Sequence, residues 1–146
     1  MASQLDSLGV QRVSAYDSQT GSYQTYVMGY TPVDMPIGDD YAYFLDCSGN
    51  TALMLYGDEF ASPHNVVLNA GWNAIAWCSL STARVSDLCG RSAAIQRVCR
   101  YNNTAGAYDT YVAGFSGEDK NFAIEPGEGY FIYLSSGPVQ INIGGI

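Results

Sequence analysis

Residues 10–16 mix apolar or aromatic positions (Val10, Val13, Ala15 and Tyr16) with polar ones, and this composition favours a β-strand. A polar segment follows, which begins with Asp17, able to accept a hydrogen bond from the backbone ahead of it, and ends with Gly21, free to take a positive φ. Beyond it, alternate residues of a second run lie on one face, namely Tyr23, Thr25 and Val27. The pattern predicts a β-hairpin with a loop of about five residues.

The chain contains this hairpin twice. Residues 10–30 return as residues 95–115 at a constant offset of 85 positions, and the aromatic positions and the turn glycine are kept. Residues 38–41 match residues 127–130 at an offset of 89, and residues 49–57 match residues 137–145 at an offset of 88. A constant offset over a long run indicates an internal repeat. The four extra residues of the second copy lie in a loop, where insertions are tolerated.

Other segments complete the two units. Short strands are expected at residues 41–47, 66–68 and 72–77. The segment from Ser81 to Arg91 favours one short helix, because Ser81 or Thr82 can cap it and Val85 and Leu88 form an apolar stripe that ends near Gly90. A whole unit is thus a strand, a helix, a hairpin and two more strands.

The first copy has no opening strand equivalent to residues 72–77. Either a longer array or a partner would supply it, because an unpaired sheet edge is a template for another chain. We therefore expect an all-β domain over residues 1–146, built of two related antiparallel β units with a pseudo-twofold. The repeats span about 5–57 and about 66–146, and form one sandwich-like or barrel-like domain with one apolar interior and one helix near residues 81–90.

Composition narrows the function. The 146 residues carry a net charge of −8, and no basic patch with interleaved aromatic residues is present, so we expect no nucleic-acid partner. Residues 1–6 have neither the basic start nor the apolar run of a signal peptide. No stretch approaches the roughly 20 apolar residues of a membrane helix, so no membrane span is expected.

Three segments of the second copy resemble a repeat module of secreted and cell-surface proteins of archaea and bacteria, including S-layer-like proteins. They are Gly71-Trp72-Asn73-Ala74-Ile75, the hairpin of residues 101–108, and the run from Glu125 to Ile132, which contains Pro126-Gly127-Glu128-Gly129-Tyr130. The resemblance covers residues 66–143 well and residues 10–57 less well, because Gly129 is replaced there by Asp40. It implies a location outside the cell or on its surface, and an architectural role; it implies no particular activity.

Four cysteines allow three disulfide pairings. Cys47 and Cys78 each end a strand, so we expect Cys47–Cys78 together with Cys89–Cys99 if the compartment is oxidising, and buried free thiols otherwise. A zinc site is not expected, because no Cys-x-x-Cys occurs and His64 is the single histidine.

The sequence predicts no enzyme and no cofactor. A nucleophile with a histidine base would need His64, whose neighbours match no catalytic signature. Acidic pairs offer three interpretations, which are solvated loop acids, a calcium site or acid–base catalysis. The pairs are Asp39-Asp40, Asp58-Glu59, Glu118-Asp119 and Glu125 with Glu128.

The tyrosines either belong to the core or form an aromatic face that stacks on sugar rings or docks a neighbour. The candidate ligand-binding residues are Tyr23, Tyr26, Tyr108 and Tyr111. We therefore expect a non-catalytic structural or assembly module of an extracellular surface protein or filament, with protein partners that include copies of itself at the open sheet edge. The alternatives are a carbohydrate-binding or polymer-binding module that uses exposed tyrosines, and a small hydrolase.

Overall fold

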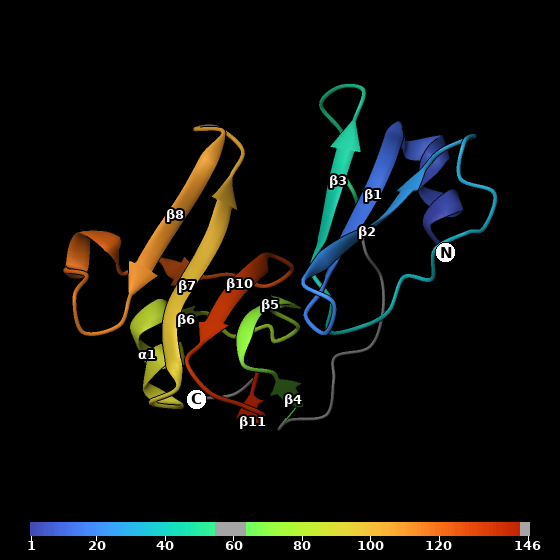
Figure 1. Ribbon diagram of the computed structural model, residues 1–146. Helices are drawn as coiled ribbons and strands as arrows, with labels where there is room; N and C mark the ends of the chain where they lie inside the picture. Colours follow the sequence, from blue (N-terminus) through green and yellow to red (C-terminus); the bar gives the residue numbers. More distant parts are fainter. Residues whose placement is uncertain (55–63, 144–146) are drawn as a thin grey trace.

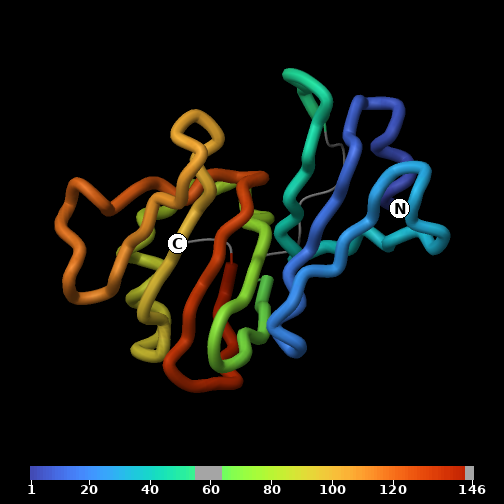
Figure 2. Tube along the Cα trace, turned by 45° about the horizontal axis from the view of Figure 1, so that its top comes forward, coloured from blue at the N-terminus to red at the C-terminus, as the bar shows by residue number. Residues whose placement is uncertain are grey.

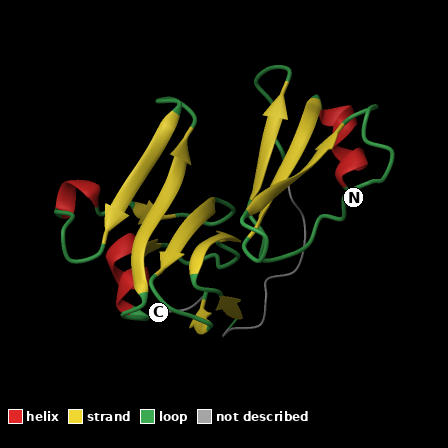
Figure 3. Ribbon diagram, in the orientation of Figure 1, coloured by secondary structure: helices red, strands yellow, loops and turns green. Residues whose placement is uncertain are grey.

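The computed structural model describes residues 1–54 and 64–143, which form two β-rich units side by side (Figures 1 and 2). Strands far outweigh helices in the described residues, every named strand pair is antiparallel, and one short α-helix is present (Figure 3). This confirms the expected all-β class. The described strands do not close into a barrel, and the sandwich-like form of the expectation fits. The predicted repeat ends at residues 57 and 146 lie outside the described residues.

The first unit is a three-stranded sheet in the order β2-β1-β3. A 3-10 helix precedes it and covers one end of the sheet, where the Ala2 N–H donates to the carbonyl of Met35 at 2.8 Å. The elements of this unit are η1 (Ala2–Leu8), β1 (Val10–Asp17), β2 (Ser22–Val27) and β3 (Tyr43–Cys47).

The second unit is a four-stranded sheet in the order β5-β10-β7-β8, accompanied by two small sheets, β11-β4 and β6-β9. The α-helix packs against β7 (Figure 1). The elements are β4 (Asn65–Leu68), β5 (Gly71–Ala76), β6 (Ala83–Arg84), α1 (Val85–Gly90), β7 (Ile95–Asn102), β8 (Ala107–Val112), η2 (Glu118–Lys120), β9 (Ala123–Ile124), β10 (Gly129–Leu134) and β11 (Val139–Asn142).

The two hairpins have the same register, as the sequence repeat predicts. Arg12 lies opposite Val27 in the first, and Arg97 lies opposite Val112 in the second. The turns also use the same chemistry, because the side chain of the residue that ends β1 or β7 accepts backbone N–H groups two and three residues ahead. Asp17 Oδ1 accepts the Gln19 N–H at 2.8 Å, and Asn102 Oδ1 accepts the Thr104 N–H at 3.1 Å.

The helix begins three to four residues later than either of the predicted capping residues. Its N-cap is Arg84, whose backbone N–H donates to Asp87 Oδ2 at 3.0 Å. Ser81 instead accepts a hydrogen bond from the Trp77 indole at its carbonyl oxygen, at 2.9 Å. The buried indole thus holds residues 79–82 in a turn, and Asp87 supplies the acidic group that a helix N-terminus favours.

The strands that follow the hairpins match at an offset of 87, and the predicted offset of 89 is wrong by two positions. Val13 lies opposite Leu45, and Val98 lies opposite Ile132. A shift of two keeps every side chain on its own face, which explains why the apolar pattern alone did not reveal it.

Backbone details support the offset of 87. The Tyr43 hydroxyl accepts the Gly38 N–H at 2.9 Å, and the Tyr130 hydroxyl accepts the Glu125 N–H at 2.8 Å, five residues back in each case. Gly127 takes a left-handed φ of 79°, and the residue 87 positions earlier, Asp40, has a φ of 68°. Asp40 therefore holds a conformation that favours glycine, and this hid the match in the sequence.

Each unit has its own buried core, so the expectation of one shared apolar interior is wrong. The inner face of the first sheet packs against η1 and the segment around Met35, and it buries Ala2, Val10, Val13, Tyr26 and Met35. The second core is much larger and includes Trp77, Leu88, Val98, Tyr130 and Ile132. Two features join the units. The outer faces of their sheets contact each other, and the segment before β3 pairs with β5, where Tyr41 forms a β-bridge with Ile75 and the Ala76 N–H donates to the Asp40 carbonyl at 3.1 Å.

Candidate functional site

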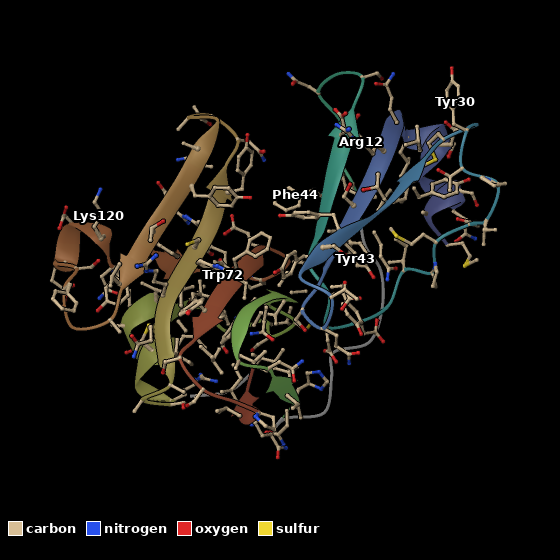
Figure 4. All side chains as sticks on the ribbon, in the orientation of Figure 1. Arg12, Tyr30, Tyr43, Phe44, Trp72 and Lys120 are labelled. Carbon is tan, nitrogen blue, oxygen red and sulfur yellow. The ribbon has the colours of Figure 1, made fainter. Side chains whose placement is uncertain are left out.

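The outer faces of the two sheets meet in a cluster of aromatic rings, which we call the aromatic seam. Strand alternation produces it, because Tyr16 and Tyr101 point away from Val13 and Val98. Figure 4 shows Phe44 between the sheets and Tyr30 pointing away from them. The seam consists of Tyr16, Tyr23 and Phe44 from the first unit and their equivalents Tyr101, Tyr108 and Phe131 from the second.

Contacts across the seam are reciprocal. The ring of Tyr16 packs edge-on against Phe131 with centroids 5.6 Å apart, and the equivalent pair, Tyr101 and Phe44, is 5.9 Å apart. Reciprocal contacts between equivalent residues are the signature of a twofold relation, because a translational repeat would form only one of the two. The pseudo-twofold expected from the sequence is therefore visible in the side chains.

Three pairs of equivalent residues contact each other directly and mark the position of the pseudo-twofold axis. Phe44 stacks on Phe131 with centroids 5.8 Å apart and an interplanar angle of 29°. Tyr23 and Tyr108 line both grooves together, and burial, with a further contribution from the neighbouring Tyr23 hydroxyl, raises the pKa of Tyr108.

The third pair is Ala42 and Gly129. A Cβ added at Gly129 would lie 2.8 Å from the Cβ of Ala42, closer than real Cβ contacts allow. The second glycine of the Pro-Gly-x-Gly-Tyr segment is therefore required by the approach of the first unit. One glycine of the repeat motif is thus a point at which the two units pack against each other.

Two grooves flank the seam, and they are lined by equivalent side chains of the two repeats. The groove on the second sheet, which we call the Trp72 groove, has a volume of about 380 Å³ and contains Arg97, Cys99, Tyr108, Thr110, Phe131 and Tyr16. The groove on the first sheet, the Asp46 groove, has a volume of about 550 Å³ and contains the equivalents Arg12, Ser14, Tyr23, Thr25, Phe44 and Tyr101. Tyr23 and Tyr108 line both grooves and so form the wall between them.

Two differences separate the grooves. Only the Trp72 groove has a tryptophan among its described lining residues. Trp72 (labelled in Figure 4) comes from β5, a strand for which the described part of the first unit has no equivalent. Its indole packs edge-on against Tyr133, with centroids 5.2 Å apart. At the position of Tyr133 the first unit has Asp46, which forms an ion pair with Arg12 at 2.9 Å.

The predicted ligand-binding tyrosines divide into two pairs. Tyr23 and Tyr108 are 50% and 47% exposed and line both grooves. Tyr26, only 8% exposed, and Tyr111 pack against the two cores, opposite Val13 and Val98. Tyr26 and Tyr111 are therefore not part of an exposed face. The reason is the strand period, since residues three positions apart in a strand lie on opposite faces.

Sequence reasoning missed the other main components of the grooves, Trp72, Phe131, Arg97 and Arg12. A signal for them was present. In each hairpin the outward side of the first strand contains an arginine, a small residue and a tyrosine at alternate positions, at residues 12, 14 and 16 and again at 97, 99 and 101.

All four cysteines are free thiols, so the expected disulfides Cys47–Cys78 and Cys89–Cys99 are absent. Cys47 packs against the first core and Cys78 against the second. Cys89 also packs against the second core, whereas Cys99 lies on the opposite face of β7, with Sγ 3.3 Å from the Thr110 hydroxyl. Burial raises the pKa of Cys89 to about 11, which keeps this thiol protonated at neutral pH.

The acidic pairs and the histidine are dispersed. His64 Nε2 contacts Asp40 Oδ1, and Glu128 accepts a hydrogen bond from the Tyr130 hydroxyl at 2.7 Å. Within residues 1–54 and 64–143, no group of three or more His, Cys, Asp or Glu side chains is arranged to hold a metal ion. Asp58-Glu59 lies outside the described residues.

Comparison of the chain with protein-family models, curated proteins and solved structures finds no match. In the part of the chain that the structure describes, no helix has the length and apolar character needed to cross a bilayer. The grooves and the repeat are therefore the basis for a functional proposal.

Proposed function

We propose that this chain is a non-catalytic module of an extracellular surface protein, which holds a saccharide chain across its two aromatic grooves. The observation that carries the proposal is the duplicated groove, in which the same set of arginine, threonine, tyrosine and phenylalanine side chains occurs on each side of the seam. The extracellular location rests on the resemblance of the Gly-Trp-Asn and Pro-Gly-x-Gly-Tyr segments to surface-protein repeats.

The chemistry of the grooves suits sugars. A sugar ring has faces of C–H groups and a rim of hydroxyls, so it needs flat apolar surface and a few polar groups at the edge. Half-buried rings such as Trp72, Tyr23 and Tyr108 offer apolar area with a polar tip. Thr110 and Thr25 place hydroxyls, which both donate and accept, in the two grooves. Such a mixture is typical of small-ligand sites.

The shared wall favours a polymer over a single sugar. Because Tyr23 and Tyr108 belong to both grooves, a chain that passes over them contacts both sites. Binding at the second groove is then intramolecular, which raises affinity without any new kind of contact.

Trp72 provides the test. Trp77 is fully buried in the second core, so a change in tryptophan fluorescence on addition of an oligosaccharide is expected to report Trp72 alone. A glycan array identifies the ligand, and titration then gives the affinity. We expect Trp72→Ala to weaken binding by about tenfold or more, and Trp72→Phe to abolish the fluorescence response while retaining most of the affinity.

Tyr30→Ala is the matched control, because Tyr30 is an exposed aromatic residue that lines neither groove. We expect this variant to bind as the wild type does. An array without signal, or equal losses in Trp72→Ala and Tyr30→Ala, would show that the grooves do not bind saccharide.

The edge of the first sheet favours a second function, self-assembly. Within the described residues β3 has β1 on one side and no strand on the other, whereas its equivalent β10 lies between β7 and β5. Such an edge presents unpaired N–H and C=O groups to another chain. We propose that β3 pairs antiparallel with β3 of a second copy, which would join two three-stranded sheets into one.

Hydrogen exchange at increasing protein concentration tests this assembly. Backbone amides of β3 are expected to gain protection as dimer forms, and those of β10, which already have neighbours on both sides, serve as the internal control. Sedimentation equilibrium should show dimers over the same range. A monomer at every concentration, with unchanged protection in β3, would contradict self-assembly.

A further inference from the structure

The two grooves share a shape but differ in charge. The Trp72 groove contains one arginine, Arg97, and no aspartate or glutamate among its described lining residues. Across the strands Arg97 lies opposite Tyr133 on one side and Val112 on the other, neither of which can form an ion pair with it. Its side chain is exposed, and no ion pair is formed by it in the described part of the chain.

The equivalent arginine in the other groove is neutralised. Arg12 occupies the same position on the first sheet, and its guanidinium binds Asp46, which replaces Tyr133, at 2.9 Å. One substitution therefore changes the site twice, since it removes an aromatic ring and adds a counter-ion. The Trp72 groove keeps an arginine without an ion-pair partner among its aromatic lining residues, while in the Asp46 groove the arginine and the aspartate balance each other.

We propose that the Trp72 groove binds an acidic sugar residue, whose ring stacks on Trp72 and whose carboxylate is held by Arg97. This inference rests on the proposed saccharide-binding function and adds the class of sugar. A guanidinium matches a carboxylate geometrically, because its parallel N–H groups donate to both oxygens. The half-buried rings around Arg97 exclude part of the water and so strengthen the interaction relative to a fully solvated pair.

The charge of the whole chain makes this arginine decisive. The net charge of −8 repels an anionic ligand at long range, so binding of an acid requires a local cation without a counter-ion. Arg97 meets this condition at the Trp72 groove, and Arg12 does not at the Asp46 groove.

Oligogalacturonate and its methyl ester form a matched pair of probes, because they share a backbone and differ in carboxylate charge. Calorimetric titration of the wild type should show that the acid binds about tenfold or more tightly than the ester. Arg97→Gln should remove this preference, so that the acid binds no more tightly than the ester. Arg12→Gln is the matched control and should keep the preference, because Arg12 is already bound to Asp46.

Asp46→Asn tests the same inference by a gain of binding. Freeing Arg12 from its counter-ion should give the Asp46 groove a cation for a further carboxylate of the same chain, so that the acid binds more tightly than it binds the wild type while the stoichiometry stays at one. Equal affinity for acid and ester, with binding still dependent on Trp72, would overturn the acidic specificity and leave saccharide binding intact. Failure of both probes to bind would overturn the acidic specificity, and an array without signal would overturn saccharide binding as well.

Discussion

Replacing Phe131 with alanine is expected to detach the first unit, which then unfolds while the second unit stays folded. Phe131 is the central ring of the aromatic seam, because it contacts Tyr16 and Phe44 of the first unit as well as Trp72 and Tyr108 of its own. Loss of a packed phenylalanine costs about 3 kcal/mol, part of it from the edge-on ring pairs. Two of its four ring partners belong to the first unit, so part of that loss falls on the contact between the units.

The first unit cannot compensate for the loss, because among the described residues its core contains five buried apolar residues, against fifteen in the second. Small units bury too little surface to be stable alone. Hydrogen exchange followed by NMR is the suitable measurement, and it should show β1 to β3 losing protection while β7 and β10 keep theirs.

Phe115→Ala is the control for this experiment, since Phe115 is 92% exposed and is not one of the rings of the seam. Phe44→Ala, the twofold equivalent, should reproduce the effect of Phe131→Ala. If Phe131→Ala instead unfolds in a single transition with uniform loss of protection, the two units are one cooperative structure and the seam is not a boundary.

Replacing Asn73 with alanine is expected to destabilise the second unit by about 3 kcal/mol. Asn73 is only 3% exposed and closes the turn between β4 and β5. Its side-chain oxygen accepts the Asn69 N–H at 2.9 Å, and its amide donates to the Asn69 carbonyl at 2.8 Å and to the Gly71 carbonyl at 3.2 Å. Alanine leaves these backbone groups without partners, which is costly where water is excluded.

Chemical denaturation followed by far-UV circular dichroism measures the loss. Asn103→Ala, in the exposed turn between β7 and β8, is the matched control and should change stability by less than about 0.5 kcal/mol. Similar stability of the two variants would mean that the Gly-Trp-Asn motif does not depend on the buried amide. If Asn73→Ala is the less stable variant, the two side chains of the motif have separate roles, because Trp72 faces the groove and Asn73 faces the interior.

The hairpins could be predicted because their information is local. The turn residues and the strand alternation lie within the same short segment, and the second copy of the hairpin supports both the predicted turn and the predicted strands. The register of the following strands could not be predicted, because Asp40 takes the place of Gly127 and hides the match. The disulfide pairing could not be predicted either, since a cysteine count does not show that Cys89, on α1, packs against the second core while Cys99 lies on the opposite face of β7.

The candidate site could be predicted only in part. Exposure of Tyr23 and Tyr108 follows from strand alternation, and the same rule places Tyr26 and Tyr111 inside. The grooves themselves depend on which faces of the two sheets meet, and no local pattern encodes that choice. The packing of Ala42 on Gly129 and of Phe44 on Phe131 determines it.

The pseudo-twofold axis relates the two grooves by a rotation of half a turn, so the two grooves point in opposite directions along a ligand that crosses the axis. This has a consequence for any linear ligand. A saccharide chain has a reducing and a non-reducing end, so a chain that runs across both sides of the axis enters one cradle head first and the other tail first. Two identical cradles could not both fit such a molecule. A ligand with two different ends therefore requires that the two halves of a pseudo-symmetric site differ. They do differ here, because Asp46 replaces Tyr133 and Trp72 is present on one side only.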